Sequence, residues 1–185
     1  MPSQDCVALR EQLSKFPGEK LGFVIYRLTY EDDGQWSRVI EHIKKRTREN
    51  LEASGDGDLV EHIDWTVRED QELNGAHSGQ VRKHFLSWVE SEGVDRHTGN
   101  PRYMACVAIE QFLVERCLKD ADAEEDPDDD LFQEKGFVML VSADKKEDVV
   151  HVAVSSIFPR VYSLLESSLW DVIKHGAIEQ GVYNG

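Results

Sequence analysis

The sequence is poor in the residues and motifs that identify most enzymes. It has 3 cysteines in 185 residues, and Cys6, Cys106 and Cys117 are too few and too irregularly spaced for a disulfide framework or a CxxC metal site. It lacks the motifs GxGxxG, GxxxxGK[ST], GxSxG and HExxH. The sequence therefore predicts no cofactor and no metal, and it leaves the catalytic residues unknown.

Long apolar runs are absent as well. The chain has nowhere 18 consecutive apolar residues, and its first twenty residues lack the apolar core of a signal peptide. With three reduced cysteines, this composition favours a cytoplasmic protein. The formal net charge of −15 repels phosphate backbones and anionic lipid surfaces, so we expect neither a nucleic acid nor a membrane partner.

The acidic excess is concentrated in one segment, residues 120–130 (DADAEEDPDDD). Like charges in a block repel each other, so we expect a solvated loop that could contact a basic protein partner. The alternating Asp126, Asp128 and Asp130 suggest calcium, but the twelfth position of such a loop would be Phe137 instead of glutamate. The pattern therefore does not predict a calcium site.

The clearest element is a strand over Gly22–Tyr30 (GFVIYRLTY), rich in β-branched and aromatic residues. A helical stripe from Trp36 to Leu51 follows it, and Leu59–Val67 then alternates like a second strand. A strand, a helix and a strand in this order predict a crossover with the two strands parallel. Arg27 is the one charge in the first strand. We expect it to lie at the sheet edge or to pair with an acid, for which Asp64 is the candidate, or else to bind an anionic ligand.

The remaining pattern predicts an α+β protein. We expect a two-layer sandwich, a ferredoxin-like variant, in which a mixed sheet of about five strands carries helices mainly on one face. An open sheet face would leave room for a homodimer contact. The domain boundaries are a leader or short helix over 1–20, a single domain over 21–176 with the acidic loop, and a tail over 177–185. The other expected elements are helices at 5–16, 78–92, 110–119 and from Pro159 to Gly176, and strands at 102–109, 136–142 and 149–155.

Aromatic and polar residues on the predicted neighbouring strands form the best candidate ligand site. Sharing a face, they would build a pocket with apolar walls and one ion pair, the usual form of a small-molecule site. The alternative is that the aromatic residues belong to the core, where such side chains dominate burial. The candidate residues are Tyr26, Arg27, Tyr30, Asp64, Trp65, Tyr103 and, on a later strand, His151.

Four phrases of the sequence resemble a group of fungal proteins of unassigned function. They are GFVIYRLTY with the following Trp36, DWTVRED, VRKHFLSWV and the closing stretch from Pro159 to Trp170. The likeness extends from Gly22 to Trp170. It implies no activity and no site residue.

Three hypotheses of function follow. The first is a cytosolic binding or regulatory module whose partner is a small molecule or a protein. The second is a small enzyme for an aromatic or anionic metabolite, with Arg27 and Tyr26 for binding and Asp64 or His151 as the proton carrier. The third is a secreted effector that acts through protein contacts.

Overall fold

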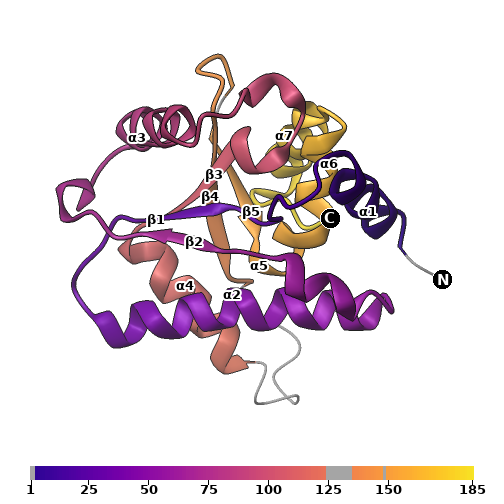
Figure 1. Cartoon of the computed structure of the whole chain (residues 1–185). Helices are drawn as coiled ribbons and strands as arrows, with labels where there is room; N and C mark the ends of the chain where they lie inside the picture. The colour runs from indigo at the N-terminus through magenta and orange to yellow at the C-terminus, as the bar shows by residue number, and fades with distance from the viewer. Residues whose placement is uncertain (1–2, 124–134, 148) are drawn as a thin grey trace.

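A computed structural model describes residues 3–123, 135–147 and 149–185 and contains one open sheet of five strands (Figure 1). The strand order is β2-β1-β3-β4-β5, with β1 parallel to β2 and β3, and with β4 antiparallel to β3 and β5. The predicted α+β class and mixed five-strand sheet are confirmed, but this order with its two parallel pairs is not a ferredoxin-like topology. The strands are β1 Val24–Arg27, β2 Thr66–Arg68, β3 Ala105–Ile109, β4 Phe137–Ser142 and β5 Val150–Ala153.

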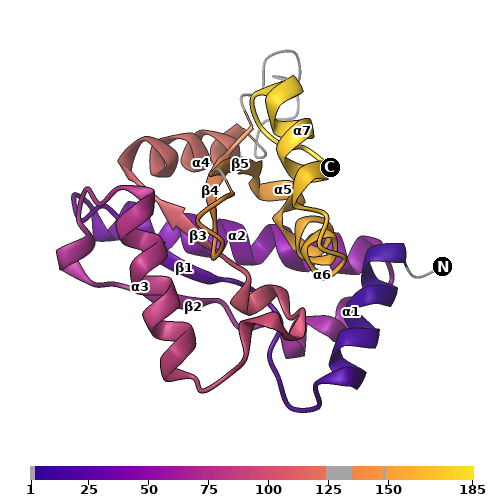
Figure 2. The same ribbon diagram turned by 90° about the horizontal axis from the view of Figure 1, so that it is seen from above.

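Seven α-helices of the described ranges surround this sheet. In Figures 1 and 2, α3 lies over one face, α2 and α4 lie under the other, and α1, α6 and α7 gather at one end of the sheet. No helix in the described part of the chain combines the length and the apolar character needed to cross a membrane. The helices are α1 Gln4–Lys15, α2 Asp33–Ala53, α3 Ser78–Ser91, α4 Gln111–Ala123, α5 Val154–Ser156, α6 Tyr162–Glu166 and α7 Trp170–Gln180. Short turns η1 Gly57–His62, η2 Gln71–Leu73, η3 Arg96–Thr98, η4 Pro101–Tyr103 and η6 Ile157–Val161 connect them.

The predicted unit of two parallel strands joined by one helix is confirmed. Asp32 caps α2, its carboxylate accepting a hydrogen bond from the backbone N–H of Gln35 at 2.9 Å. The apolar stripe of α2 then packs under β1. Because β2 and β3 lie on opposite sides of β1, connections of the usual right-handed sense carry α2 across one face and α3 across the other.

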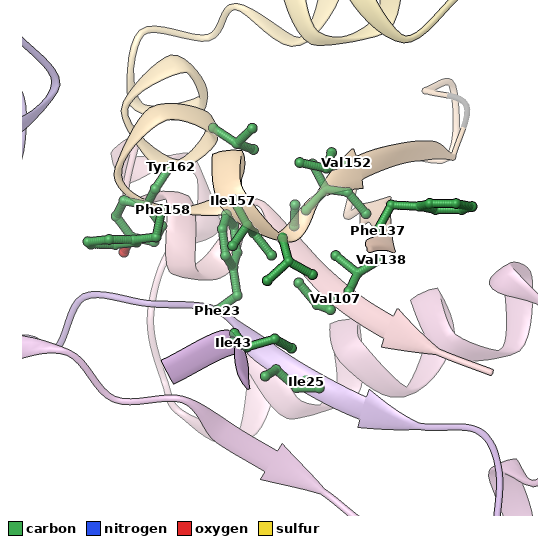
Figure 3. Packing of buried hydrophobic residues seen from close by; sticks show 14 of the residues in the cluster. Phe23, Ile25, Ile43, Val107, Phe137, Val138, Val152, Ile157, Phe158 and Tyr162 are labelled. Atoms are coloured by element: carbon green, nitrogen blue, oxygen red, sulfur yellow. The ribbon is translucent and has the colours of Figure 1, made fainter. Parts of the chain in front are cut away.

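The core consequently has two parts, one on each face of the sheet. Figure 3 shows the first, where Phe23, which precedes β1, packs with Ile25 of β1, Val107 of β3 and Ile43 of α2. On the second face, α3 covers β1 and β3. The residues buried there include Val24, Tyr26, Leu28, Cys106, Ala108, Val81, Phe85 and Val89.

This second core corrects the two-layer prediction. The face that we expected to be open is covered by α3 at β1 and β3, giving three layers in that half of the molecule. The homodimer contact stays a prediction, but the apolar side chains of β1 and β3 that it would use are buried. Most helices still lie away from α3, as expected.

Tertiary contacts change the boundaries of several predicted elements. The predicted strand Leu59–Val67 is mostly η1 and loop, because Arg10 of α1 binds Asp56 and Asp58 at 2.8 Å each and holds the segment as a turn. The predicted last helix breaks between α6 and α7, where Ser168 has a φ of 56°.

Both ends of the described chain and part of the acidic segment also differ from the simplest expectation. Cys6 and Leu9 anchor α1 in the core, so the first segment docks on the domain. At the other end α7 continues to Gln180, and Tyr183 pairs with Val152. The helix α4 extends to Ala123, and the rest of the predicted acidic loop, with its alternating aspartates, lies outside the described residues.

Candidate functional site

The guanidinium of Arg27 is buried and fully engaged. Its side chain is 5% exposed, and its Nη2 and Nη1 lie 2.5 Å from Asp33 Oδ1 and 3.1 Å from Glu69 Oε1. Its Nε donates to the backbone carbonyl of Thr29 at 2.7 Å. The group therefore has its hydrogen-bond needs met by the protein itself, which favours the structural alternative over an anion site.

Aromatic rings hold the same guanidinium in place. Its central carbon lies 4.4 Å from the centroid of Tyr30 and 5.2 Å from that of Trp36, within the range of cation–π attraction. The carboxyl end of parallel strands is the common ligand position in doubly wound sheets. Here Arg27 and its partners fill that position beside β1.

The predicted pair between Arg27 and Asp64 is wrong, and the strand register explains why. Val24 lies opposite Thr66 and Tyr26 opposite Arg68, so Asp64 falls near the start of β1 and the residue after Arg68 falls near Arg27. Arg102 binds Asp64 instead, with 2.7 Å between its Nη2 and Asp64 Oδ2.

The other predicted site residues are spread over the molecule. Tyr26 is buried under α3, and this burial raises the pKa of its phenol. Tyr103 is also buried on the α3 side and stacks on Trp88. His151 lies on β5, at the opposite edge of the sheet from β2. The sequence-based site is therefore not one pocket.

Two of the predicted residues, Asp64 and Trp65, do share a hollow. It lies between α2 and the segment leading into β2, has a volume of about 290 Å³, and is called the α2–β2 hollow below. It falls at the lower end of the size range of small-molecule sites. Its lining residues are Lys44, Thr47, Arg48, Val60, Ile63, Asp64 and Trp65.

Thr47 is the unusual member of this lining. It is 3% exposed, and its Oγ1 has no hydrogen-bond partner in the structure. Buried hydroxyls are nearly always paired, because an unpaired one costs free energy. A threonine inside a helix can bond to the carbonyl one turn earlier, but no such bond forms here. The Thr47 hydroxyl therefore keeps an unused donor and acceptor in the lining of the hollow.

Two cations of α2 line the same hollow. Lys44 lies three residues before Thr47 and four before Arg48, spacings that make residues neighbours on a helix. Lys44 lies 2.9 Å from Glu41, an exposed surface pair. Arg48 is exposed and makes no hydrogen bond or ion pair within the described ranges. The acid of the lining, Asp64, has its charge offset by Arg102.

The aromatic wall of the hollow is rigid. The indole of Trp65 packs against Phe23 and Phe158, with ring centroids 6.3 and 6.1 Å away. The α2–β2 hollow thus combines a fixed flat wall, a buried free hydroxyl and two cations. This combination suits a small flat molecule that carries a negative charge.

A second cluster looks catalytic but lacks the necessary chemistry. His42 Nε2 lies 3.0 Å from Asp120 Oδ2, both groups being buried between α2 and α4, and Cys117 is one turn before Asp120. Burial and the nearby carboxylate raise the pKa of the Cys117 thiol to about 12, so it stays protonated and is a poor nucleophile. We interpret the cluster as a packed helix–helix contact.

Sequence reasoning missed the cations and the threonine of the α2–β2 hollow. The sequence predicts only a helical stripe from Trp36 to Leu51 and does not single out Lys44, Thr47 or Arg48. The available signal was a hydroxyl inside that stripe flanked by basic residues. Within the described ranges, no group of three or more His, Cys, Asp or Glu side chains is arranged to hold a metal ion.

Comparison with protein-family models, with curated proteins and with solved structures finds no match for this chain. The resemblance to fungal proteins therefore stays a prediction.

Proposed function

We propose that the protein is a binding module that takes up a small aromatic carboxylic acid in the α2–β2 hollow. The observation that carries this proposal is the buried Thr47 hydroxyl, which has no partner and lines the same hollow as Lys44 and Arg48. Natural proteins tolerate a buried hydroxyl of this kind mainly where a ligand or another polar group supplies its hydrogen-bond partner.

The chemistry of the lining selects the class of ligand. A guanidinium binds a carboxylate through two parallel hydrogen bonds, which gives Arg48 a geometric preference for this anion. The indole of Trp65 offers a face for a flat ring. A volume of about 290 Å³ accommodates a single ring with its substituent.

The alternative hypothesis of a small enzyme has less support from this geometry. Its two proton carriers, Asp64 and His151, lie at opposite edges of the sheet. The Asp64 carboxylate also accepts hydrogen bonds from Arg102 and Thr66, at 2.7 and 2.8 Å. Binding needs only groups that the hollow already contains.

Titration with benzoate tests the proposal. The chain has four tryptophans, so the indole N–H signals in a proton–nitrogen spectrum are few and can be assigned. We expect benzoate to move the Trp65 signal and Arg48→Ala to weaken binding about tenfold, because a charged hydrogen bond is lost at a partly solvated site.

Two controls make the titration specific. Lys45→Ala removes an equal charge from the same helix but outside the lining, and it should leave the affinity unchanged within a factor of two. Benzamide, a neutral molecule of the same shape, should bind far more weakly than benzoate. An unmoved Trp65 signal, or equal losses in the Arg48 and Lys45 variants, would refute the proposal.

A further inference from the structure

A second hollow lies where the β4–β5 hairpin meets η3, η4 and α3. Its volume is about 450 Å³, and it is called the hairpin hollow below. In Figure 1 the hairpin rises above the sheet beside these elements. The lining residues are Leu86, His97, Tyr103, Met104, Ser142, Ala143, Asp144, Lys145 and Lys146. None of them lines the α2–β2 hollow.

The apolar wall of the hairpin hollow is held by a stack of three rings. Tyr103 stacks on Trp88 with centroids 5.8 Å apart and planes at 25°, and Trp88 stacks on Phe85 at 5.9 Å and 18°. Such offset stacks fix the orientation of their members. Leu86 and Met104 extend this wall, giving a flat and weakly polar surface.

Hydrogen bonds fix the hairpin against that wall. The backbone N–H of Ala143 donates to the carbonyl of Met104 at 2.8 Å. Arg82 of α3 donates from Nε to the carbonyl of Ser142 at 2.7 Å and from Nη2 to that of Glu147 at 3.2 Å. The end of β4 and the far side of the turn are therefore both tied to α3.

That tip carries two adjacent cations. Lys145 and Lys146 make no ion pair with any described carboxylate, whereas Lys15 and Lys45 lie 3.4 and 3.8 Å from glutamates. The Asp144 carboxylate accepts a hydrogen bond from the backbone N–H of Lys146 at 2.9 Å, which shapes the turn. The lining thus has two lysine charges against one aspartate, in a chain whose formal net charge is −15.

We infer that the hairpin hollow binds a phosphate monoester whose organic part is a flat ring system. Lysine ammonium groups act as point charges that suit a compact dianion such as phosphate. The ring would lie on the wall formed by Tyr103 and Met104, and His97 faces the same space. A volume of about 450 Å³ lies within the range of ligand sites, which allows a molecule the size of a mononucleotide.

Adenosine 5′-monophosphate is the probe for this inference. The chain has three methionines, so methyl labelling gives a simple spectrum in which Met104 lines the hollow and Met139 lies on β4, outside its lining. We expect the probe to move the Met104 methyl signal and not that of Met139. We expect Lys145→Ala combined with Lys146→Ala to weaken binding about tenfold.

The matched control is Lys83→Ala combined with Lys119→Ala, which removes the same charge from two exposed positions outside the lining. It should change the affinity by less than twofold at physiological salt. Adenosine and inorganic phosphate are the two partial ligands, and each should bind at least about tenfold more weakly than the intact probe.

Four results would overturn the inference. The first is a Met104 methyl signal that the nucleotide does not move, and the second is equal nucleotide affinity of the two double variants. The third is adenosine binding as tightly as the nucleotide, and the fourth is inorganic phosphate binding as tightly as the nucleotide. The third would show that the lysines do not contribute, and the fourth that the wall does not. Because the probe and the signal differ from those of the benzoate experiment, either proposal can fail while the other stands.

Discussion

Replacing Asn100 by leucine is expected to lower the free energy of unfolding by about 4 kcal/mol, because several buried polar groups lose their partner together. Asn100 is 0% exposed. Its Oδ1 accepts from Gln12 Nε2 at 2.8 Å, from the backbone N–H of Arg102 at 3.1 Å and from the Tyr162 hydroxyl at 3.3 Å, and its Nδ2 donates to Glu19. Each buried group left unpaired costs about 1–3 kcal/mol. Leucine has a similar volume, so a cavity contributes little.

This loss exceeds the effect of most single substitutions, because one amide joins α1, η4 and α6. Urea unfolding followed by circular dichroism measures it. Asn74→Leu, at an exposed turn, is the matched control and should cost less than about 1 kcal/mol. A loss below about 1 kcal/mol for the Asn100 variant would mean that this network does not hold the three elements together.

The second large effect concerns the partners of Arg27. Asp33→Asn combined with Glu69→Gln keeps the shapes of both side chains but leaves a guanidinium that is 5% exposed without a countercharge. Stranding a buried charge costs about 3–5 kcal/mol, and we expect about 3 here because the rings of Tyr30 and Trp36 still attract the cation.

Removing the cation itself should cost less. In Arg27→Met the two carboxylates are left behind, but their side chains are 87% and 48% exposed and water can solvate them. We therefore expect a loss of about 1 kcal/mol from the same unfolding measurement. For the double variant Asp33→Asn with Glu69→Gln, the charge-matched control is Glu31→Gln combined with Glu72→Gln, at two exposed positions. A larger loss for Arg27→Met than for the double variant would contradict this account of the ion pair.

The sequence was sufficient for features that local pattern determines. The run of β-branched and aromatic residues around Ile25 and the stripe of α2 predicted the β1–α2–β2 unit. The strands predicted at 136–142 and 149–155 correspond to β4 and β5. These features depend on residues that are close together in the sequence, so a short stretch of sequence is enough to predict them.

Features that depend on contacts across the chain could not be read in the same way. The stripe of α3 was visible, but the face it covers follows from the position of β3 beside β1. The partner of Asp64 follows from the register of β1 and β2, which a strand pattern alone does not determine. The site was predicted only through Asp64 and Trp65, because the unpaired state of the Thr47 hydroxyl is a property of the folded protein.

The substitution Thr47→Val tests the proposed function most directly. Valine has the shape of threonine without the hydroxyl, so it removes a buried polar group that has no partner in the protein. We expect the free energy of unfolding to stay the same or rise by about 1 kcal/mol, while the affinity for benzoate falls about tenfold. Thr47→Ser, which keeps the hydroxyl, should retain the affinity. A valine variant that binds benzoate as tightly as the original protein would contradict the proposed site.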